Sequence, residues 1–95
     1  MRNFARPRLP ALREMSPAKA AIEVFAWIGV TVILMAYALV SFDVIESDSI
    51  TFQLSNLIGA AGIASISFLR QVFQPLVLNT TWAVIALVAI IRIAL

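Results

Sequence analysis

The side chains best able to do chemistry in this chain are amides and hydroxyls that interrupt apolar segments. The densest set lies in FQLSNLIGAAG, residues 52–62, namely Gln53, Ser55 and Asn56, with Gly59 and Gly62 beside them. On a helix Gln53 and Asn56 are three positions apart and therefore share a face. Uncharged amides in lipid either bond to a neighbouring helix or line a polar path, so both interpretations stay open here.

The residue types exclude several other kinds of site. The chain has no cysteine and no histidine, which removes disulfides and the usual zinc or haem ligands. The acids Asp43, Glu46 and Asp48 are close in sequence, but their spacing does not match a calcium-binding EF-hand loop. We interpret them as a solvated loop. We expect no catalytic, metal or cofactor site, no enzymatic activity and no nucleic-acid partner.

The elements that carry these residues are predicted to be membrane-spanning helices. Hydrophobic residues make up 62% of the 95 residues and charged residues 13%, whereas soluble domains are nearer half apolar and a quarter charged. Three apolar segments, 22–42, 50–69 and 76–95, each have the roughly twenty residues that a spanning helix needs. Lipid offers no partner to backbone groups, so these segments must be helices. The predicted fold is an all-α integral membrane bundle of three transmembrane helices, the second central.

The ends of the predicted helices carry local signals. We divide the chain into a basic tail, residues 1–16, and a transmembrane domain, residues 17–95. Ser16 precedes Pro17, a pair typical of a helix start. The segments 43–49 and 70–75 are predicted to be short loops, with Pro75 suited to the first turn of the third helix.

Charge predicts how the helices are oriented and which ionic groups pair. Basic residues are concentrated in the N-terminal tail, and the 43–49 loop has none. The positive-inside rule therefore places the N-terminus in the cytoplasm and the C-terminus outside. Arg92 is expected to extend towards the outer headgroups. Glu23 follows Lys19 by one helical turn, so we expect these two to form an ion pair. The tail arginines either bind anionic lipid or a protein partner, or serve only to fix the orientation.

Small residues in the second segment predict close helix packing. Ser55 and Gly59 form a small-xxx-small pair, and Ala60 with Ala64 repeats the spacing. We expect the glycines and amides to meet another membrane subunit, either a copy of this chain or a different protein. Asn56 and Asn79 should differ in depth by about 15 Å, so they should not bond to each other.

The order of motifs also resembles known proteins. The pattern comprises Trp-Ile-Gly, Ala-Tyr-x-Leu-Val-Ser, Ser-x-x-Phe-Gln-Leu-x-Asn-Leu-x-Gly-Ala-x-Gly and Pro-x-x-x-Asn-x-x-Trp-x-x-Ile-Ala. Over roughly residues 26–92 it is similar to a family of small uncharacterised bacterial membrane proteins. This resemblance implies a place in the bacterial cytoplasmic (inner) membrane.

A remoter resemblance is to the three-helix modules of the PQ-loop superfamily, which includes bacterial half-size sugar transporters. It rests on the short loops, the polar second helix and Pro75-x-x-x-Asn79. The resemblance implies that Asn79 lines a substrate site, with Trp82 as a possible second lining residue. Val40-Ser41 stands where those transporters have a Pro-Gln hinge, and Ile63 lies near the position of their second-helix tryptophan.

Two functions follow as hypotheses. The first is an accessory or packing subunit of a larger membrane complex. The second is a half-size transporter of the PQ-loop type, working as a homodimer on a small polar solute. A transporter needs a hinge, a pocket and a two-fold mate, whereas a packing subunit needs small-residue stripes and no pocket. The departures at Val40-Ser41 and Ile63 favour the first hypothesis.

Overall fold

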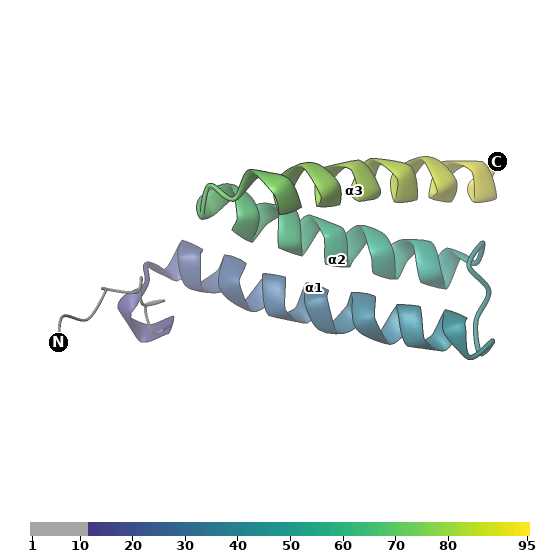
Figure 1. Cartoon of the computed structure of the whole chain (residues 1–95), viewed down its shortest axis with the longest axis horizontal. Coiled ribbons are helices and arrows are strands. Elements are labelled where there is room, and N and C mark those ends of the chain that lie inside the picture. The colour runs from purple at the N-terminus through teal and green to yellow at the C-terminus, as the bar shows by residue number, and fades with distance from the viewer. Residues whose placement is uncertain (1–11) are drawn as a thin grey trace, which may run out of the picture.

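The computed structural model describes residues 12–95, which form helices and no strand. The elements are a short 3₁₀ turn η1 (Leu12–Glu14) and the helices α1 (Pro17–Ser41), α2 (Ile50–Leu69) and α3 (Phe73–Ala94) (Figure 1). Each of the three α-helices is long and apolar enough to cross a membrane. The predicted all-α fold with three candidate membrane spans is therefore confirmed. Residues 1–11 of the predicted basic tail lie outside the described residues.

Hydroxyl caps begin the first two helices. The backbone N–H of Lys19 donates to Ser16 Oγ at 3.3 Å, and Pro17 occupies the first helical position. Ser49 caps α2 in the same way, accepting from the backbone N–H of Phe52 at 3.2 Å. These bonds satisfy backbone donors that have no partner inside a helix. The helix start predicted at Ser16 and Pro17 is the one observed.

The second loop is shorter than predicted. α3 begins at Phe73, so the expected loop 70–75 reduces to residues 70–72. Pro75 falls in the first turn of α3, as the sequence suggested. Its missing N–H costs nothing there, because the first N–H groups of a helix have no intrahelical acceptor. A helix can therefore begin two residues before this proline.

The first two helices end in the same backbone motif. Asp43 and Gln71, each the second residue after its helix, adopt left-handed conformations with φ of 60° and 56°. The next backbone N–H in each case bonds five residues back, to the carbonyl oxygens of Leu39 and Ser67 at 2.8 and 3.0 Å. This is the Schellman arrangement, in which glycine usually takes the left-handed position. Two non-glycine residues hold it in this chain.

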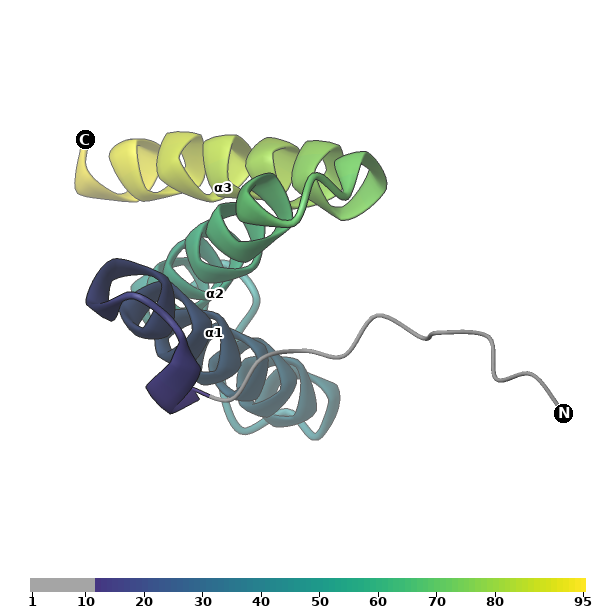
Figure 2. The same ribbon diagram turned by 90° about the vertical axis from the view of Figure 1, so that its left-hand side faces the viewer.

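The three helices lie side by side in the order α1, α2, α3. α2 packs against both neighbours, and α1 and α3 do not contact each other in the described part of the chain (Figure 2). The predicted central position of the second helix is confirmed. The loop before α2 and the C-terminus lie at one end of the molecule, while η1 and the 70–72 loop lie at the other (Figure 1).

Small residues make the helix contacts. The buried residues of the three helices are Ala26, Gly29, Ala36, Gly59, Ala60, Gly62, Ser67, Asn79 and Ala86. Large apolar side chains face outwards instead; Leu34 on α1 is 64% exposed and Val77 on α3 is 65% exposed. This is the reverse of a water-soluble protein, in which large apolar side chains are buried. In lipid it is the expected arrangement, because lipid tails solvate large apolar side chains and small residues let helices approach.

Candidate functional site

Glycines bring α1 and α2 into close contact. A Cβ atom placed on Gly29 would lie 2.8 Å from the carbonyl oxygen of Gly59. One placed on Gly62 would lie 2.9 Å from the carbonyl oxygen of Phe25. Real Cβ atoms do not come this close to a backbone, so only glycine fits at either position. The two helices therefore touch through their main chains.

This contact corrects one expectation from the sequence. Gly59 and Gly62 were predicted to meet another subunit, but they pack against α1 of the same chain. The physical reason is Gly29, inside the first apolar segment, which leaves the space on α1 that the α2 glycines fit. The glycine stripe thus belongs to internal packing and is not available to a partner.

The polar side chains of the same segment divide into satisfied and unsatisfied groups. Gln53 Nε2 donates to the carbonyl oxygen of Ser47 at 3.1 Å, so this amide fastens the preceding loop to α2. Ser55 Oγ donates to the carbonyl oxygen of Thr51 at 2.8 Å, within its own helix. Asn56 is half-buried, and its side chain makes no hydrogen bond to any residue of the described range. Of the three polar residues, only Asn56 keeps its full bonding capacity.

Asn79 is buried at the start of α3. Its side chain is 5% exposed, and its Nδ2 donates to the carbonyl oxygen of Pro75 at 2.9 Å. Because α3 contacts only α2 among the described elements, Asn79 is packed against α2. Its Oδ1 is buried and has no hydrogen-bond partner within residues 12–95. Asn56 and Asn79 do not bond to each other, as their predicted depths required.

Among residues 12–95, neither Asn79 nor Trp82 lines the larger depressions of the surface. Trp82 is 41% exposed on α3, while Asn79 is enclosed. The depressions at the two ends of the molecule and along α3 are lined by other residues. The ligand-lining role that the PQ-loop resemblance implies for these two residues stays a prediction.

An ion pair between helices lies at the end opposite to the C-terminus. Arg70, which follows α2, bonds through Nη2 to Glu23 Oε2 on α1. The Glu23 side chain is 12% exposed and that of Arg70 is 36% exposed. A cavity of about 150 Å³ lies beside the pair, with Trp27 and Ile63 among its lining residues. The predicted pair of Glu23 with Lys19 is therefore wrong, because packing of α1 on α2 brings Arg70 closer to the carboxylate than local helical spacing brings Lys19.

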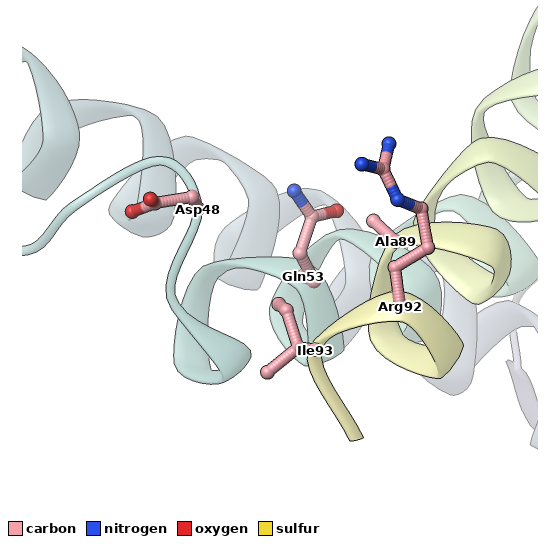
Figure 3. A pocket seen from close by; sticks show the side chains of 5 residues that line it. All are labelled: Asp48, Gln53, Ala89, Arg92 and Ile93. Carbon is pink, nitrogen blue, oxygen red and sulfur yellow. The ribbon is translucent and has the colours of Figure 1, made fainter. Parts of the chain in front are cut away.

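A second polar depression lies at the other end, between the start of α2 and the end of α3. It has a volume of about 320 Å³ and is lined by Asp48, Gln53, Ala89, Arg92 and Ile93 (Figure 3). The Gln53 side chain lies between Asp48 on one side and Arg92 on the other (Figure 3). Asp48 was expected in a solvated loop, and Arg92 was expected to extend towards the headgroups. Their sequence positions do not indicate that they line one depression, because only the antiparallel packing of α2 and α3 brings them together.

Comparison with known proteins connects the chain to one family. The model of an uncharacterised family matches residues 22–95, a range that includes most of α1 and all of α2 and α3. No curated protein and no solved structure matches the chain. None of the three comparisons shows a similarity to the PQ-loop superfamily.

Proposed function

The chain belongs to this uncharacterised family, and we propose that it acts as an accessory subunit that packs against the helices of a larger membrane complex in the bacterial cytoplasmic membrane. It is a small protein with three apolar helices, each able to span a membrane. Two asparagines of these helices have side-chain groups without a hydrogen-bond partner within residues 12–95, so a second protein can bind there.

Asn56 carries the proposal. It lies about 9 Å along α2 from Ile50, at a 1.5 Å rise per residue, and so inside the predicted span. An amide at this depth cannot bond to water or to lipid tails, and an unsatisfied polar group there is costly. The residue is only half-buried, so another helix can reach it. A donor or acceptor from a second protein would satisfy Asn56 and hold the subunit in one register.

The open arrangement of the helices supports the same function. α1 and α3 each contact α2 and not each other within the described residues. No large side chain of the described residues is fully buried. Residues 12–95 of a single copy therefore do not surround a path across the membrane, and the outer helix faces are available for lateral contacts. These features suit a packing subunit better than a self-contained transporter.

A half-size transporter is the second candidate, and one observation favours it. The buried Oδ1 of Asn79 has no hydrogen-bond partner among the described residues, as an acceptor waiting for water or a small polar solute would. In this hypothesis two copies would form the path, as in the PQ-loop modules that the sequence remotely resembles. The close packing of Asn79 against α2 makes it the weaker candidate.

Purification of the tagged chain from native membranes in mild detergent tests the proposal. We expect a complex of defined mass that contains a second, larger membrane protein. Asn56→Leu should weaken the complex by about 1 kcal/mol or less, seen as less of the larger protein retained, because leucine cannot satisfy its polar group. Ser55→Ala is the matched control: the neighbouring hydroxyl already bonds to Thr51, so its loss should leave the complex intact. Circular dichroism of each purified variant checks that the helices are preserved.

Two outcomes would contradict the accessory role. The first is a complex made only of copies of this chain. The second is retention of the larger protein by Asn56→Leu to the same extent as by Ser55→Ala. A two-copy complex that also moves a solute into vesicles, and stops doing so in Asn79→Leu, would establish the transporter instead.

A further inference from the structure

The depression at the C-terminal end of the helices holds two opposite charges that are not paired. Asp48 precedes α2, and Arg92 lies in the last turn of α3. Both line the same depression of about 320 Å³, with the Gln53 side chain between them (Figure 3). Within residues 12–95 neither charge forms a salt bridge or a side-chain hydrogen bond. A carboxylate and a guanidinium are thus presented to one space without neutralising each other.

Gln53 fixes the loop that carries Asp48. Its Nε2 donates to the carbonyl oxygen of Ser47, which ties the loop containing Asp48 to the first turns of α2. The amide oxygen lies on the side of Arg92 (Figure 3). An amide has two donors and an acceptor, so Gln53 retains bonding capacity towards the depression. The site therefore presents three groups side by side: the Arg92 guanidinium, which can bind an anion, the neutral Gln53 amide, and the Asp48 carboxylate, which can bind a cation.

The chemistry that fits is a zwitterion with a phosphate at one end and a primary ammonium at the other. A guanidinium binds phosphate oxygens through two parallel hydrogen bonds, which makes Arg92 the phosphate contact. A carboxylate accepts charge-assisted hydrogen bonds from an ammonium group, which makes Asp48 the amine contact. A volume of about 320 Å³ is within the range of pockets for small ligands. Phosphoethanolamine has both groups.

The position of the site indicates that this group is part of a lipid. α2 begins and α3 ends here, so the depression lies at the ends of two candidate spans, where the inserted chain would meet the headgroups. Ala89 and Ile93 provide an apolar wall. Ile85, one helical turn below Ala89 on the same face, is 57% exposed and continues this wall towards the membrane interior. A phospholipid whose phosphate is bound at Arg92 would have its acyl chains along this side of α3.

We propose that Asp48, Gln53 and Arg92 form a binding site for the headgroup of an aminophospholipid, phosphatidylethanolamine in chemical class. The site does not depend on the accessory role, because Asn56, the residue that carries that role, is not part of it. Choline lipids keep the cationic charge but have no N–H to donate to Asp48. Glycerol headgroups have no cation at all. The arrangement therefore selects for a primary amine.

Native mass spectrometry of the full chain tests the site. The protein is incorporated into nanodiscs with equal amounts of phosphatidylethanolamine, phosphatidylcholine and phosphatidylglycerol, and the lipids it retains on release are counted. We expect roughly fivefold to tenfold preference for phosphatidylethanolamine, the ratio that one charge-assisted hydrogen bond provides. Asp48→Asn should remove the preference while some lipid is still bound. Arg92→Gln should reduce the retention of all three lipids.

Asp43→Asn is the matched control for Asp48→Asn. It makes the same charge change in the same loop, outside the depression, and asparagine tolerates the left-handed backbone of that position. Its lipid preference should equal that of the parent. Equal retention of the three lipids by the parent, or identical behaviour of the two asparagine variants, would overturn the proposal. Equally tight binding of soluble glycerophosphoethanolamine would overturn the assignment to a lipid.

Discussion

Gly29 and Gly59 touch through their backbones where α1 crosses α2: a methyl group on Gly29 would lie 2.8 Å from the Gly59 carbonyl oxygen. A side chain can rotate away from such a contact, but a carbonyl oxygen in a helix cannot move alone. Any added carbon must therefore push the two helices apart. The interface between α1 and α2 depends on the absence of atoms at this point.

Gly29→Ala should weaken the α1–α2 contact. We expect a loss of about 1–3 kcal/mol in the free energy of unfolding, the usual cost of overpacking a close contact. Reversible unfolding in mixed detergent micelles, followed by circular dichroism, measures it. Ala38→Leu adds more volume to an exposed position of the same helix and should change stability little. If both variants lose the same stability, the glycine contact is not the cause.

Gly59→Ala should behave differently because its nearest obstacle is a side chain. Its Cβ would lie 2.3 Å from Ile33 Cγ1 as well as 2.8 Å from the Gly29 carbonyl oxygen. Adding Ile33→Ala should therefore recover part of the loss, and a double-mutant cycle gives the coupling. No coupling beyond about 0.5 kcal/mol would show that Ile33 is not what the new methyl group meets.

Glu23 and Arg70 should be energetically coupled. A cycle of Glu23→Gln and Arg70→Gln should give about 1 kcal/mol, the upper end for a partly exposed pair, because Glu23 is mostly shielded. The coupling should decrease with added salt. Lys19→Gln combined with Glu23→Gln is the control and should show none. A larger coupling with Lys19 than with Arg70 would contradict the observed pair.

Gln71→Gly should stabilise the protein. Gln71 has a φ of 56°, a conformation that costs non-glycine residues free energy and costs glycine none. We expect a gain of about 0.5–1 kcal/mol, seen as a shift of the unfolding midpoint. Gln74→Gly, at an exposed helical position of α3, should instead destabilise. A loss of stability in both variants would mean that the Gln71 side chain has a role of its own.

The orientation in the membrane is open to a direct test because the chain has no cysteine. Ser47→Cys, in the loop before α2, should react with a membrane-impermeant maleimide added to intact cells. Gln74→Cys, at the other end of the helices, should react only after the membrane is permeabilised. This pattern follows from the positive-inside rule. The reverse pattern would place the N-terminal end outside.

Local signals predicted the helices, and packing determined what the sequence analysis missed. Ser16 and Pro17 predicted the start of α1 because a cap depends on adjacent residues. The composition of segment 50–69 matched α2 because lipid forces an apolar segment to be helical. By contrast, Gly29 gave no signal by itself. A single glycine in an apolar helix becomes meaningful only when its mate is known.

The same limit applies to the polar site residues. Lys19 was chosen for Glu23 on helical spacing, whereas Arg70 is brought to it by the contact between helices. Asn79 gave no indication that its amide would turn back to Pro75 and leave one oxygen unpaired. A polar side chain in lipid has few possible hydrogen-bond or ion-pair partners. Which of them it contacts depends on distances between helices, and these cannot be read from the sequence.

The side-by-side order α1, α2, α3 also has a consequence for folding during synthesis. Both interfaces join helices that are consecutive along the chain, and none of the described elements joins the first helix to the third. The hairpin of α1 and α2, including the glycine contact, is complete before α3 has been synthesised. Assembly can thus follow the order in which the ribosome delivers the helices, without waiting for a distant segment to close the structure.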